Sequence, residues 1–298
     1  VYNAEQYLST CIDSVIEQLN DDDEWIVIDD ASTDKSLAIL SNYKQLQVFA
    51  NQENLKLPRS LNKAIGLASK KYIARMDADD RCRPDRFDLQ QKFLDKHPNI
   101  GVVGGWAEII DKDDNPLGYY KTPSQHYRIK WKMLFSNPMI HPSLMARAEI
   151  FIDNPYNENY INSQDYELWS RLMFEKGIKF ANIKTPLLEY RVHDKSSTAT
   201  KDLGKKKLSL GISLNNLKRY IEPKKTESDI YSRFRLGEKI SLTDLFLLDI
   251  FYLKCFVNFV NKEKLTIVYK LILFIDLLRS YKFSFREYLK KLIRRKQA

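Results

Sequence analysis

The sequence is poor in glycine and in cysteine, and both shortages exclude classes of site. It has nine glycines in 298 residues, and they form neither the GxxxxGK[ST] pattern of a P-loop nor the GxGxxG pattern of dinucleotide-binding proteins. Its three cysteines, Cys11, Cys82 and Cys255, have no pair spacing. This argues against disulfides and a zinc site, and it favours a reducing compartment.

Long uninterrupted apolar runs are also missing. The apolar stretches at 242–260 and 265–278 are broken by aspartate and lysine, so no transmembrane helix is expected. Charge is unevenly distributed, because residues 201–298 hold 23 Lys and Arg against 10 Asp and Glu, whereas residues 1–200 hold 25 against 29. We therefore predict two regions with different partners, at 1–200 and 201–298.

What the sequence does contain is a cluster of acidic residues at the end of an apolar run. The β-prone residues 72–76 lead into Asp77, Asp79 and Asp80, and Pro84 then begins a predicted helix. Carboxylates this close repel one another unless water or a cation lies between them. All-oxygen ligands suit Mg²⁺ or Mn²⁺, which keep open positions for phosphates. The alternative is a solvated acidic turn.

A second acidic loop occurs earlier in the chain. The apolar spacing of residues 5–19 predicts a helix, and the short apolar strand at 25–28 runs directly into Asp29 and Asp30. Predicted helices at 37–43 and 60–69 and strands at 47–50 and 72–76 complete a β/α alternation, which is typical of a parallel sheet with helices on both faces. Both acidic loops would then open on the same edge, where ligands bind. One carboxylate of the first loop would accept from a base or ribose, and the second loop would hold a metal on a diphosphate.

The middle of the chain predicts further strands. Residues 101–110 and a return strand from Tyr119 form a hairpin, whose acidic turn at 111–116 we assign to solvent. The pair Gly104-Gly105 would admit a sugar against bare backbone, or would mark a bulge or tight packing. Residues 178–183 and 187–192 predict two short strands.

Six segments, taken in order, resemble the motifs of the glycosyltransferase family 2 enzymes of GT-A fold, in particular those of bacterial surface polysaccharides. They are VYNAEQYL, VIDDASTD, ARMDADDRCRPDRF, NPMIHPSLMARAEIF, NSQDYELWSRL and YRVH, and they cover about residues 1–200. The resemblance implies a nucleotide-sugar-binding mixed sheet flanked by helices, followed here by a helical region. It also implies an inverting transferase that uses a nucleotide sugar, commonly a UDP-sugar, with Mn²⁺ or Mg²⁺.

The resemblance further implies roles for single residues. Asp30 matches the uracil-contacting carboxylate, Asp77 and Asp79 match the DxD pair, with Asp79 as the direct metal ligand, and Asp165 matches the general base. Arg191, His193 and Lys195 match basic or histidine residues that ligate the metal or neutralise the leaving diphosphate, and His193 is our first choice for a second metal ligand. The complete set expected to bind the nucleotide sugar is Tyr2, Asn3, Asp29, Asp30, Asn54, Arg75, Asp77, Ala78, Asp79 and His141.

Alternatives remain for several of these residues. Asp165 stands in the first turn of a predicted helix, where a carboxylate also serves as a cap. His141 would bind a sugar or phosphate oxygen, or be satisfied within its own loop. Tyr2-Asn3 matches the end of a first strand, so we expect a strand before Val1.

The basic region from residue 201 combines lysine and arginine clusters with apolar helical stripes. Leu245, Leu248, Phe251, Tyr252 and Phe256 form one stripe, as an interfacial helix on an anionic membrane would require. A helical subdomain packed on the core, or a dimer contact, is the alternative. No nucleic-acid-binding module accompanies the charge. We expect a cytoplasmic protein at the inner face of the plasma membrane.

The function expected from these features is transfer of a hexosyl or N-acetylhexosaminyl group to a glycan or lipid-linked acceptor. Two alternatives stay open. One is a non-catalytic nucleotide- or glycan-binding domain, which would not need Asp165, and the other is a metal-dependent phosphohydrolase.

Overall fold

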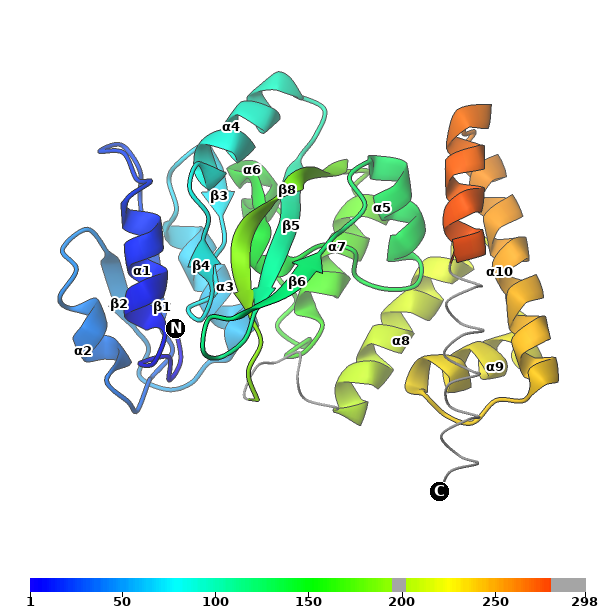
Figure 1. Cartoon of the computed structure of the whole chain (residues 1–298), viewed down its shortest axis with the longest axis horizontal. Coiled ribbons are helices and arrows are strands. Elements are labelled where there is room, and N and C mark those ends of the chain that lie inside the picture. Colours follow the sequence, from blue (N-terminus) through cyan, green and yellow to red (C-terminus); the bar gives the residue numbers. More distant parts are fainter. Residues whose placement is uncertain (195–201, 280–298) are drawn as a thin grey trace. The chain divides into compact units, whose positions relative to one another are not determined.

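The computed structural model describes residues 1–194 and 202–279, which form two compact units (Figure 1). The first unit comprises Val1–Ile129 and Asn137–Asp202, and the second comprises Lys130–Ser136 and the chain from Leu203. The boundary expected at residue 200 lies outside the described residues, as do Lys195 and the terminal basic clusters at 290–296. The elements up to residue 191 are, in order, α1 (Leu8–Ile16), β1 (Ile26–Asp29), α2 (Ser36–Leu40), β2 (Gln47–Ala50), α3 (Leu57–Leu67), β3 (Tyr72–Ala74), β4 (Arg81–Cys82), α4 (Arg86–Lys96), β5 (Val102–Ile110), β6 (Pro116–Tyr120), α5 (His126–Met133), β7 (Met145–Arg147), α6 (Ala148–Ile152), α7 (Gln164–Phe174) and β8 (Phe180–Arg191).

The strands of the first unit form two sheets. β1 and β2 pair in parallel, while a larger mixed sheet has the order β3-β7-β5-β8-β4, with β6 paired to β5. Within the larger sheet β5 and β8 are parallel and the other pairings are antiparallel. The predicted α/β class with a mixed sheet is therefore confirmed, although only the pair β1–β2 has the purely parallel arrangement expected for the first part of the chain.

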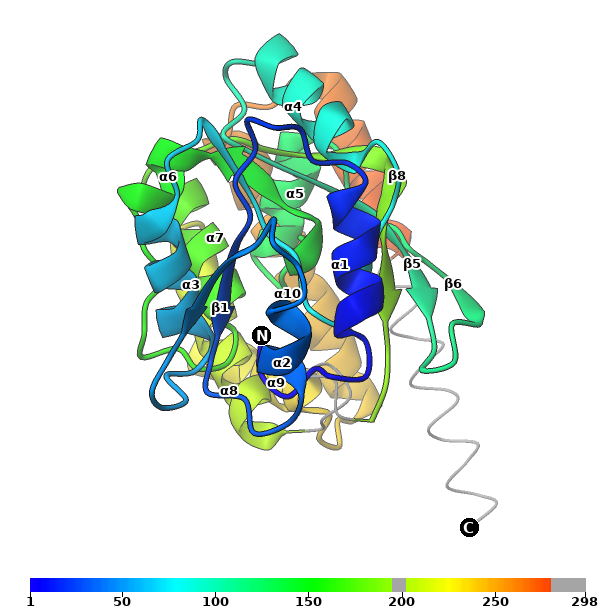
Figure 2. The same ribbon diagram turned by 90° about the vertical axis from the view of Figure 1, so that its left-hand side faces the viewer.

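β1 is covered by helices on both faces (Figure 2). Leu8 and Ile12 of α1 pack with Val27 of β1 and Leu40 of α2 in one buried cluster. α3 also contacts β1, and Figure 2 shows it on the side opposite α1. Burial of apolar side chains on both faces explains why the strand Ile26–Asp29 is a continuous apolar run that ends at its first carboxylate.

The predicted strands at 178–183 and 187–192 are one strand, β8, with an irregular register opposite Gly105 and Trp106. A Cβ on Gly105 would lie 2.4 Å from the Leu187 side chain, and one on Gly104 would lie 2.5 Å from Asn182 Oδ1. The two glycines are thus needed for close packing of β5 on its neighbours, and they are not available to a sugar.

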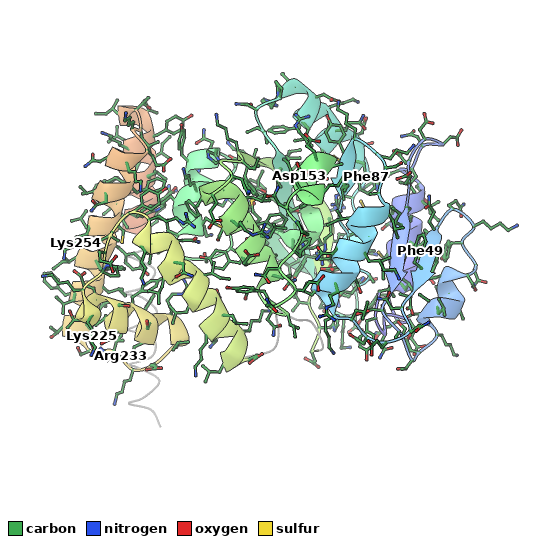
Figure 3. All side chains as sticks on the ribbon, turned by 180° about the vertical axis from the view of Figure 1, so that it is seen from behind. Phe49, Phe87, Asp153, Lys225, Arg233 and Lys254 are labelled. Carbon is green, nitrogen blue, oxygen red and sulfur yellow. The ribbon has the colours of Figure 1, made fainter. Side chains whose placement is uncertain are left out.

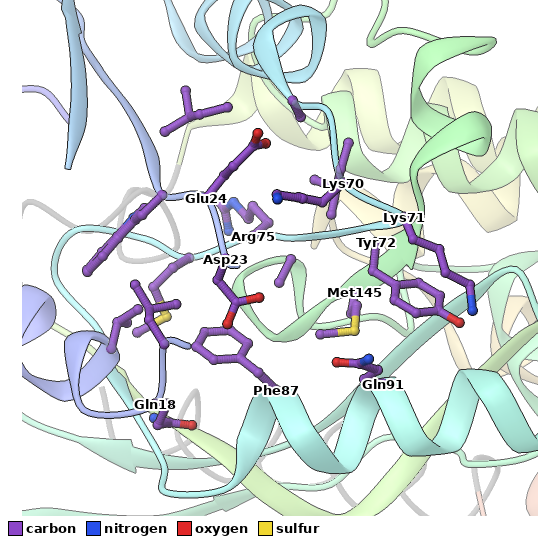
Figure 4. Close-up of a pocket in the computed structure, with 18 of the residues that line it drawn as sticks. Gln18, Asp23, Glu24, Lys70, Lys71, Tyr72, Arg75, Phe87, Gln91 and Met145 are labelled. Atoms are coloured by element: carbon purple, nitrogen blue, oxygen red, sulfur yellow. The ribbon is translucent and has the colours of Figure 1, made fainter. Parts of the chain in front are cut away.

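A cavity of about 810 Å³ is lined by residues of both β1 and β3 (Figure 4). Ile26 borders it on one side, Tyr72 and Met145 on the other, and α3 contributes Ala64 and Ile65. Among the described residues only Val1 continues the ladder of β1 here, because its amine donates to Ile28 O (2.7 Å) and its carbonyl accepts from Asp30 N (2.8 Å).

The second unit is helical. Besides the end of α5, its described elements are α8 (Leu203–Lys218), α9 (Lys225–Leu236), α10 (Leu242–Lys262) and a helix at 267–279. Trp131 packs edge-on against Phe259 at a centroid distance of 5.3 Å. Lys254 of α10 pairs with Glu227 of α9, and Arg233 pairs with Asp244 at 3.2 Å (Figure 3).

The apolar stripe expected to contact a membrane is internal to this unit. Leu245, Leu248, Phe251 and Phe256 are buried, and Tyr252 is half-buried. This stripe therefore forms part of the core of a helical subdomain, which was the alternative prediction. A different stripe of α10 is exposed, and its members are Leu242, Phe246, Ile250, Leu253 and Val257.

Candidate functional site

The loop after β1 holds two buried carboxylates. Asp30 is 5 % exposed, and its oxygens accept from Asn51 Nδ2 (2.8 Å), Leu55 N (2.9 Å) and Lys56 N (3.0 Å). Burial alone would raise the pKa of Asp30. The hydrogen bonds lower this pKa by more than burial raises it, so the net pKa is below its ordinary value. Asp30 is therefore an ionised acceptor that also fastens the segment 51–56 to the strand end.

The neighbouring residues of this loop are tied to the start of the chain. Asn3 N donates to Ser32 Oγ (3.0 Å), and Asn3 Oδ1 accepts from Thr33 N (2.8 Å). Asp29 is buried, with Oδ2 accepting from Ser32 N at 3.1 Å and Oδ1 without a partner among the described residues. Asp29 thus stabilises the loop from its buried side through Ser32 N. Tyr2, by contrast, is half exposed.

The loop after β3 concentrates negative charge. Asp77, Asp79 and Asp80 each offer a carboxylate oxygen, and these oxygens lie within 4.8 Å of one another. Burial, more than the neighbouring carboxylates, raises the pKa of Asp80 well above its ordinary value. Its Oδ2 is buried without a hydrogen-bond partner among the described residues. Repelling, incompletely satisfied carboxylate oxygens suit a hard divalent cation, so the residues fit the expected metal.

Two basic side chains adjoin this cluster. Arg75 pairs with Asp77 through both guanidinium Nη atoms, one at 2.9 Å. Burial still raises the pKa of Asp77 despite Arg75. His193, two residues beyond β8, lies with Nε2 3.1 Å from Asp79 Oδ2. The Asp79–His193 contact brings together the two residues expected to ligate the metal.

The two loops meet around one cavity of about 910 Å³, which we call the acidic cavity. The structure therefore assembles most of the predicted set in one place. The predicted residues that line it are Tyr2, Asn3, Asp30, Asn54, Arg75, Asp77, Ala78, Asp79 and His193. Asp29, His141 and Asp165 are not in this lining.

Asp165 lies in the first turn of α7 and is half-buried. Its Oδ2 accepts from Asn137 Nδ2 (2.7 Å), and its Oδ1 accepts from Tyr166 N (2.8 Å). Burial lowers the pKa of Arg75, but the negative charges of Asp77, Asp80 and Asp165 raise it above its ordinary value. Asp165 thus acts electrostatically on Arg75, which lines the acidic cavity, and its role as the general base stays a prediction.

His141 is placed in the core. Its Nε2 lies 2.8 Å from Tyr156 Oη, and its ring packs edge-on to Trp169 at 5.7 Å. Burial lowers the pKa of His141 well below its ordinary value, so the ring is neutral. This environment fits the alternative in which the protein itself satisfies the histidine.

Arg191, which we had grouped with possible diphosphate ligands, is 2 % exposed and is used within the protein. Its Nε donates to Asp79 O (2.8 Å), and its Nη1 donates to Asp111 O (3.1 Å) and pairs with Asp114. The turn at 111–116, which we assigned to solvent, therefore contacts the acidic loop indirectly, because Asp114 pairs with Arg191 and Arg191 donates to Asp79 O. No local pattern indicated this contact, because the partners are about 80 and 110 residues apart in sequence.

Comparison with known proteins shows the family of this chain. The family model "Glycosyl transferase family 2" matches residues 1–154. An uncharacterized glycosyltransferase of Haemophilus influenzae is 32 % identical over 234 residues, which are 74 % of this chain and 72 % of that protein. The O-antigen biosynthesis glycosyltransferase WbnJ of Escherichia coli is 28 % identical over 207 residues, 66 % of this chain and 79 % of WbnJ.

Solved structures extend the likeness to the fold. S. aureus TarS 1-349 in complex with UDP-GlcNAc has a TM-score of 0.57 at 16 % identity, covering 96 % of this chain and 90 % of that one. The mannosyltransferase PcManGT from Pyrobaculum calidifontis, in complex with GDP-Man and Mn²⁺, has a TM-score of 0.56 at 15 % identity, covering 97 % and 80 %. These likenesses show a GT-A fold. With two acidic loops around one cavity, a family model over more than half of its residues and a relative of similar length, this chain belongs to glycosyltransferase family 2.

Proposed function

We propose that the protein is an inverting, metal-dependent glycosyltransferase of polysaccharide synthesis. It takes a hexosyl or N-acetylhexosaminyl group from a UDP-sugar and transfers it to a glycan or a lipid-linked acceptor. The observation that carries the proposal is the acidic cavity, where Asp30 faces the same space as Asp77 and Asp79. Relatives that share the family, such as the O-antigen enzyme, support the polysaccharide context.

In this proposal each of the two loops binds a different part of the nucleotide sugar. Asp30 and Asn54 bind the base and ribose, because carboxylate and amide groups match the ring N–H and hydroxyl groups of a nucleoside. Asp79 and His193 would hold Mn²⁺ or Mg²⁺, with Asp77 kept in place by Arg75. The ion, when bound, supplies Lewis-acid stabilisation of the charge on the departing diphosphate.

Asp165 is the general base of the proposed reaction. It removes the proton of the acceptor hydroxyl as that oxygen attacks the anomeric carbon from the face opposite the diphosphate. One displacement inverts the configuration at that carbon. Support comes from the half-buried position of Asp165, which is held by donors on both oxygens.

A panel of nucleotide sugars tested for protection against thermal unfolding, with and without Mn²⁺, identifies the donor. Asp165→Asn should then lower turnover by about 10² to 10⁴ while donor affinity is retained. The matched control is Glu167→Gln, which removes a carboxylate from the same helical turn, where it pairs with Arg171.

Near-normal transfer by the Asp165→Asn variant would refute the role of Asp165. Free phosphate released without an acceptor would favour the phosphohydrolase instead. Donor binding without any transfer or hydrolysis, in both the wild type and the variant, would favour a non-catalytic binding domain.

We also propose that the second unit binds the anionic inner face of the plasma membrane. The exposed stripe of α10 includes Phe246, which is 65 % exposed, and the helix at 267–279 exposes Ile267 and Leu271. Residues 201–298 carry an excess of 13 positive charges. Exposed apolar residues in a region of the chain with excess positive charge suit an anionic bilayer. In the described residues no helix is both long and apolar enough to span a membrane.

Co-sedimentation with vesicles tests this surface. Binding should require anionic lipid, fall at high salt, and weaken in Phe246→Ser with Val257→Ser. The control Leu37→Ser changes an exposed apolar residue of the first unit. Light scattering that shows a dimer which those two α10 substitutions dissolve would instead identify the stripe as a contact between copies.

A further inference from the structure

Asn137 makes two hydrogen bonds that fix its amide in one orientation. Its Oδ1 accepts from Met139 N (3.0 Å), and its Nδ2 donates to Asp165 Oδ2 (2.7 Å). A backbone N–H is always a donor, so it assigns the oxygen of the amide. The NH₂ group must therefore point at the Asp165 carboxylate.

This contact joins two segments that are far apart in sequence. Asn137 precedes Pro138 in the stretch that leads to the short helix at His141–Ser143, whereas Asp165 is the second residue of α7. The other Asp165 oxygen accepts from Tyr166 N (2.8 Å). Asn137 and the start of α7 thus hold the carboxylate from two directions.

We propose that Asn137 is the positioning residue of the general base, an inference that rests on the function proposed for Asp165. The amide donates to the ionised carboxylate, keeps it in one rotamer and favours its charged form. Both effects matter for a base, because it must be unprotonated and aligned when the acceptor arrives.

Other charged or titratable groups also act on this carboxylate. Arg75, from the loop after β3, is positively charged, and the negative charge of Asp165 raises its pKa. The hydroxyls of Tyr120 in β6 and Tyr156 are raised in pKa by burial and further by Asp165. Glu167 and Arg171 of α7 pair with each other. Substitutions at Asn137 leave all of these side chains in place, so the contribution of Asn137 is measured as the difference from wild type.

Asn137→Asp is the decisive variant. It retains an oxygen for Met139 N but replaces the donor facing Asp165 with a second carboxylate. Two carboxylates in contact raise one pKa by about one unit or more. Titration of the ¹³C-labelled aspartate carboxyls, with Asp165 assigned by its loss in Asp165→Asn, should show its midpoint rise by about that amount.

Asn20→Asp is the matched control. Asn20 Nδ2 also donates to a carboxylate, Asp23 Oδ2 at 3.2 Å, but in an exposed turn between α1 and β1. It changes the net charge equally and should leave the Asp165 midpoint in place. In an assay of UDP release from UDP-GlcNAc, the acidic side of the kcat–pH profile of Asn137→Asp should shift with the Asp165 midpoint. Asn137→Ala should lower kcat about tenfold or more with donor KM nearly unchanged.

The inference fails if the Asp165 midpoint in Asn137→Asp matches wild type, or if Asn137→Ala keeps wild-type kcat. The titration needs no acceptor and no turnover, so it reports on the contact by itself. If Asp165→Asn remains active, the proposed base is wrong. If Asp165→Asn is inactive while both Asn137 variants behave as wild type, only the role of Asn137 is wrong.

Discussion

The two acidic loops of the first unit look alike in sequence, yet their carboxylates are in opposite electrostatic situations. Asp30, after β1, receives three hydrogen bonds from the segment 51–56, and its pKa is lowered overall. Asp80, after β3, is as deeply buried, but it faces Asp77 and Asp79, and its pKa is raised well above normal. The Asp30 carboxylate is hydrogen-bonded on both oxygens when ionised, whereas the Asp80 carboxylate needs a proton or a cation.

The difference assigns a task to each loop. A carboxylate that the protein already stabilises as an anion is a fixed acceptor for neutral donors such as a base or ribose. A cluster that repels itself has unused affinity for positive charge. One kind of residue therefore serves two kinds of recognition, and the surrounding donors decide which.

The largest effect should come from Asp79→Ala. It removes the carboxylate that contacts His193 and leaves the Asp30 loop untouched. Loss of an outer partner of a metal typically costs about 10- to 100-fold in affinity, so loss of a direct ligand should cost at least about 100-fold. Calorimetry with UDP and Mn²⁺ should show the metal-dependent part of binding disappear. Unchanged Mn²⁺ dependence would remove the distinction between the loops.

Asp30→Ala should instead destabilise the protein itself. It leaves the N–H group of Leu55 without its acceptor, whereas Lys56 N still has Asn54 Oδ1, and an unsatisfied buried donor costs about 1–3 kcal/mol. We expect a loss of about 1–3 kcal/mol in urea unfolding without metal at pH 7. The loss should shrink as pH falls through the lowered pKa of Asp30, because protonation removes the same contribution from the wild type. A variant as stable as wild type would contradict this view.

Asp80→Asn should act in the other direction. Because the folded-state pKa of Asp80 is raised, ionisation destabilises the fold, and stability falls as pH rises from the ordinary value of 3.8 toward the raised one. The variant keeps an oxygen for Arg191 N and removes the charge. Without metal it should gain stability at pH 7, about 1.4 kcal/mol for each pH unit of the shift, and gain nothing near pH 4. Urea unfolding in EDTA at several pH values measures this, and a loss of stability at pH 7 would be the contrary result.

The smallest effect belongs to Asp113→Asn, in the turn between β5 and β6. Asp113 is exposed and pairs with Lys112, its neighbour in sequence. Surface substitutions of this kind change stability within about 0.5 kcal/mol, so neither unfolding nor binding of UDP with Mn²⁺ should shift. A larger change would mean that the turn supports the acidic loop through more than Asp114.

Local patterns predicted much of the first unit. The apolar run before Asp29 predicted β1, and the spacing in residues 5–19 predicted α1. The run before Asp77 predicted β3, although this strand ends at Ala74, two residues earlier than expected. The irregular register at Gly105 fits the bulge or tight packing that we gave as the alternative for the glycine pair. The single long strand β8 was not predicted, because strand pairing depends on residues about 80 positions away. In the second unit, periodicity found the stripe of Leu245 and Phe251 but assigned it to a membrane, since an apolar face looks the same whether protein or lipid covers it.

By itself the sequence determined which chemical groups follow each strand of the first unit: carboxylates at 29–30 and 77–80, and a histidine at 193. These follow from composition and local periodicity, which act over a few residues. Only the tertiary structure decided that Arg191 serves the acidic loop, that His141 is buried against Trp169, and that Asn137 reaches Asp165. Those contacts depend on packing between segments distant in the chain, and packing is a property of the whole fold.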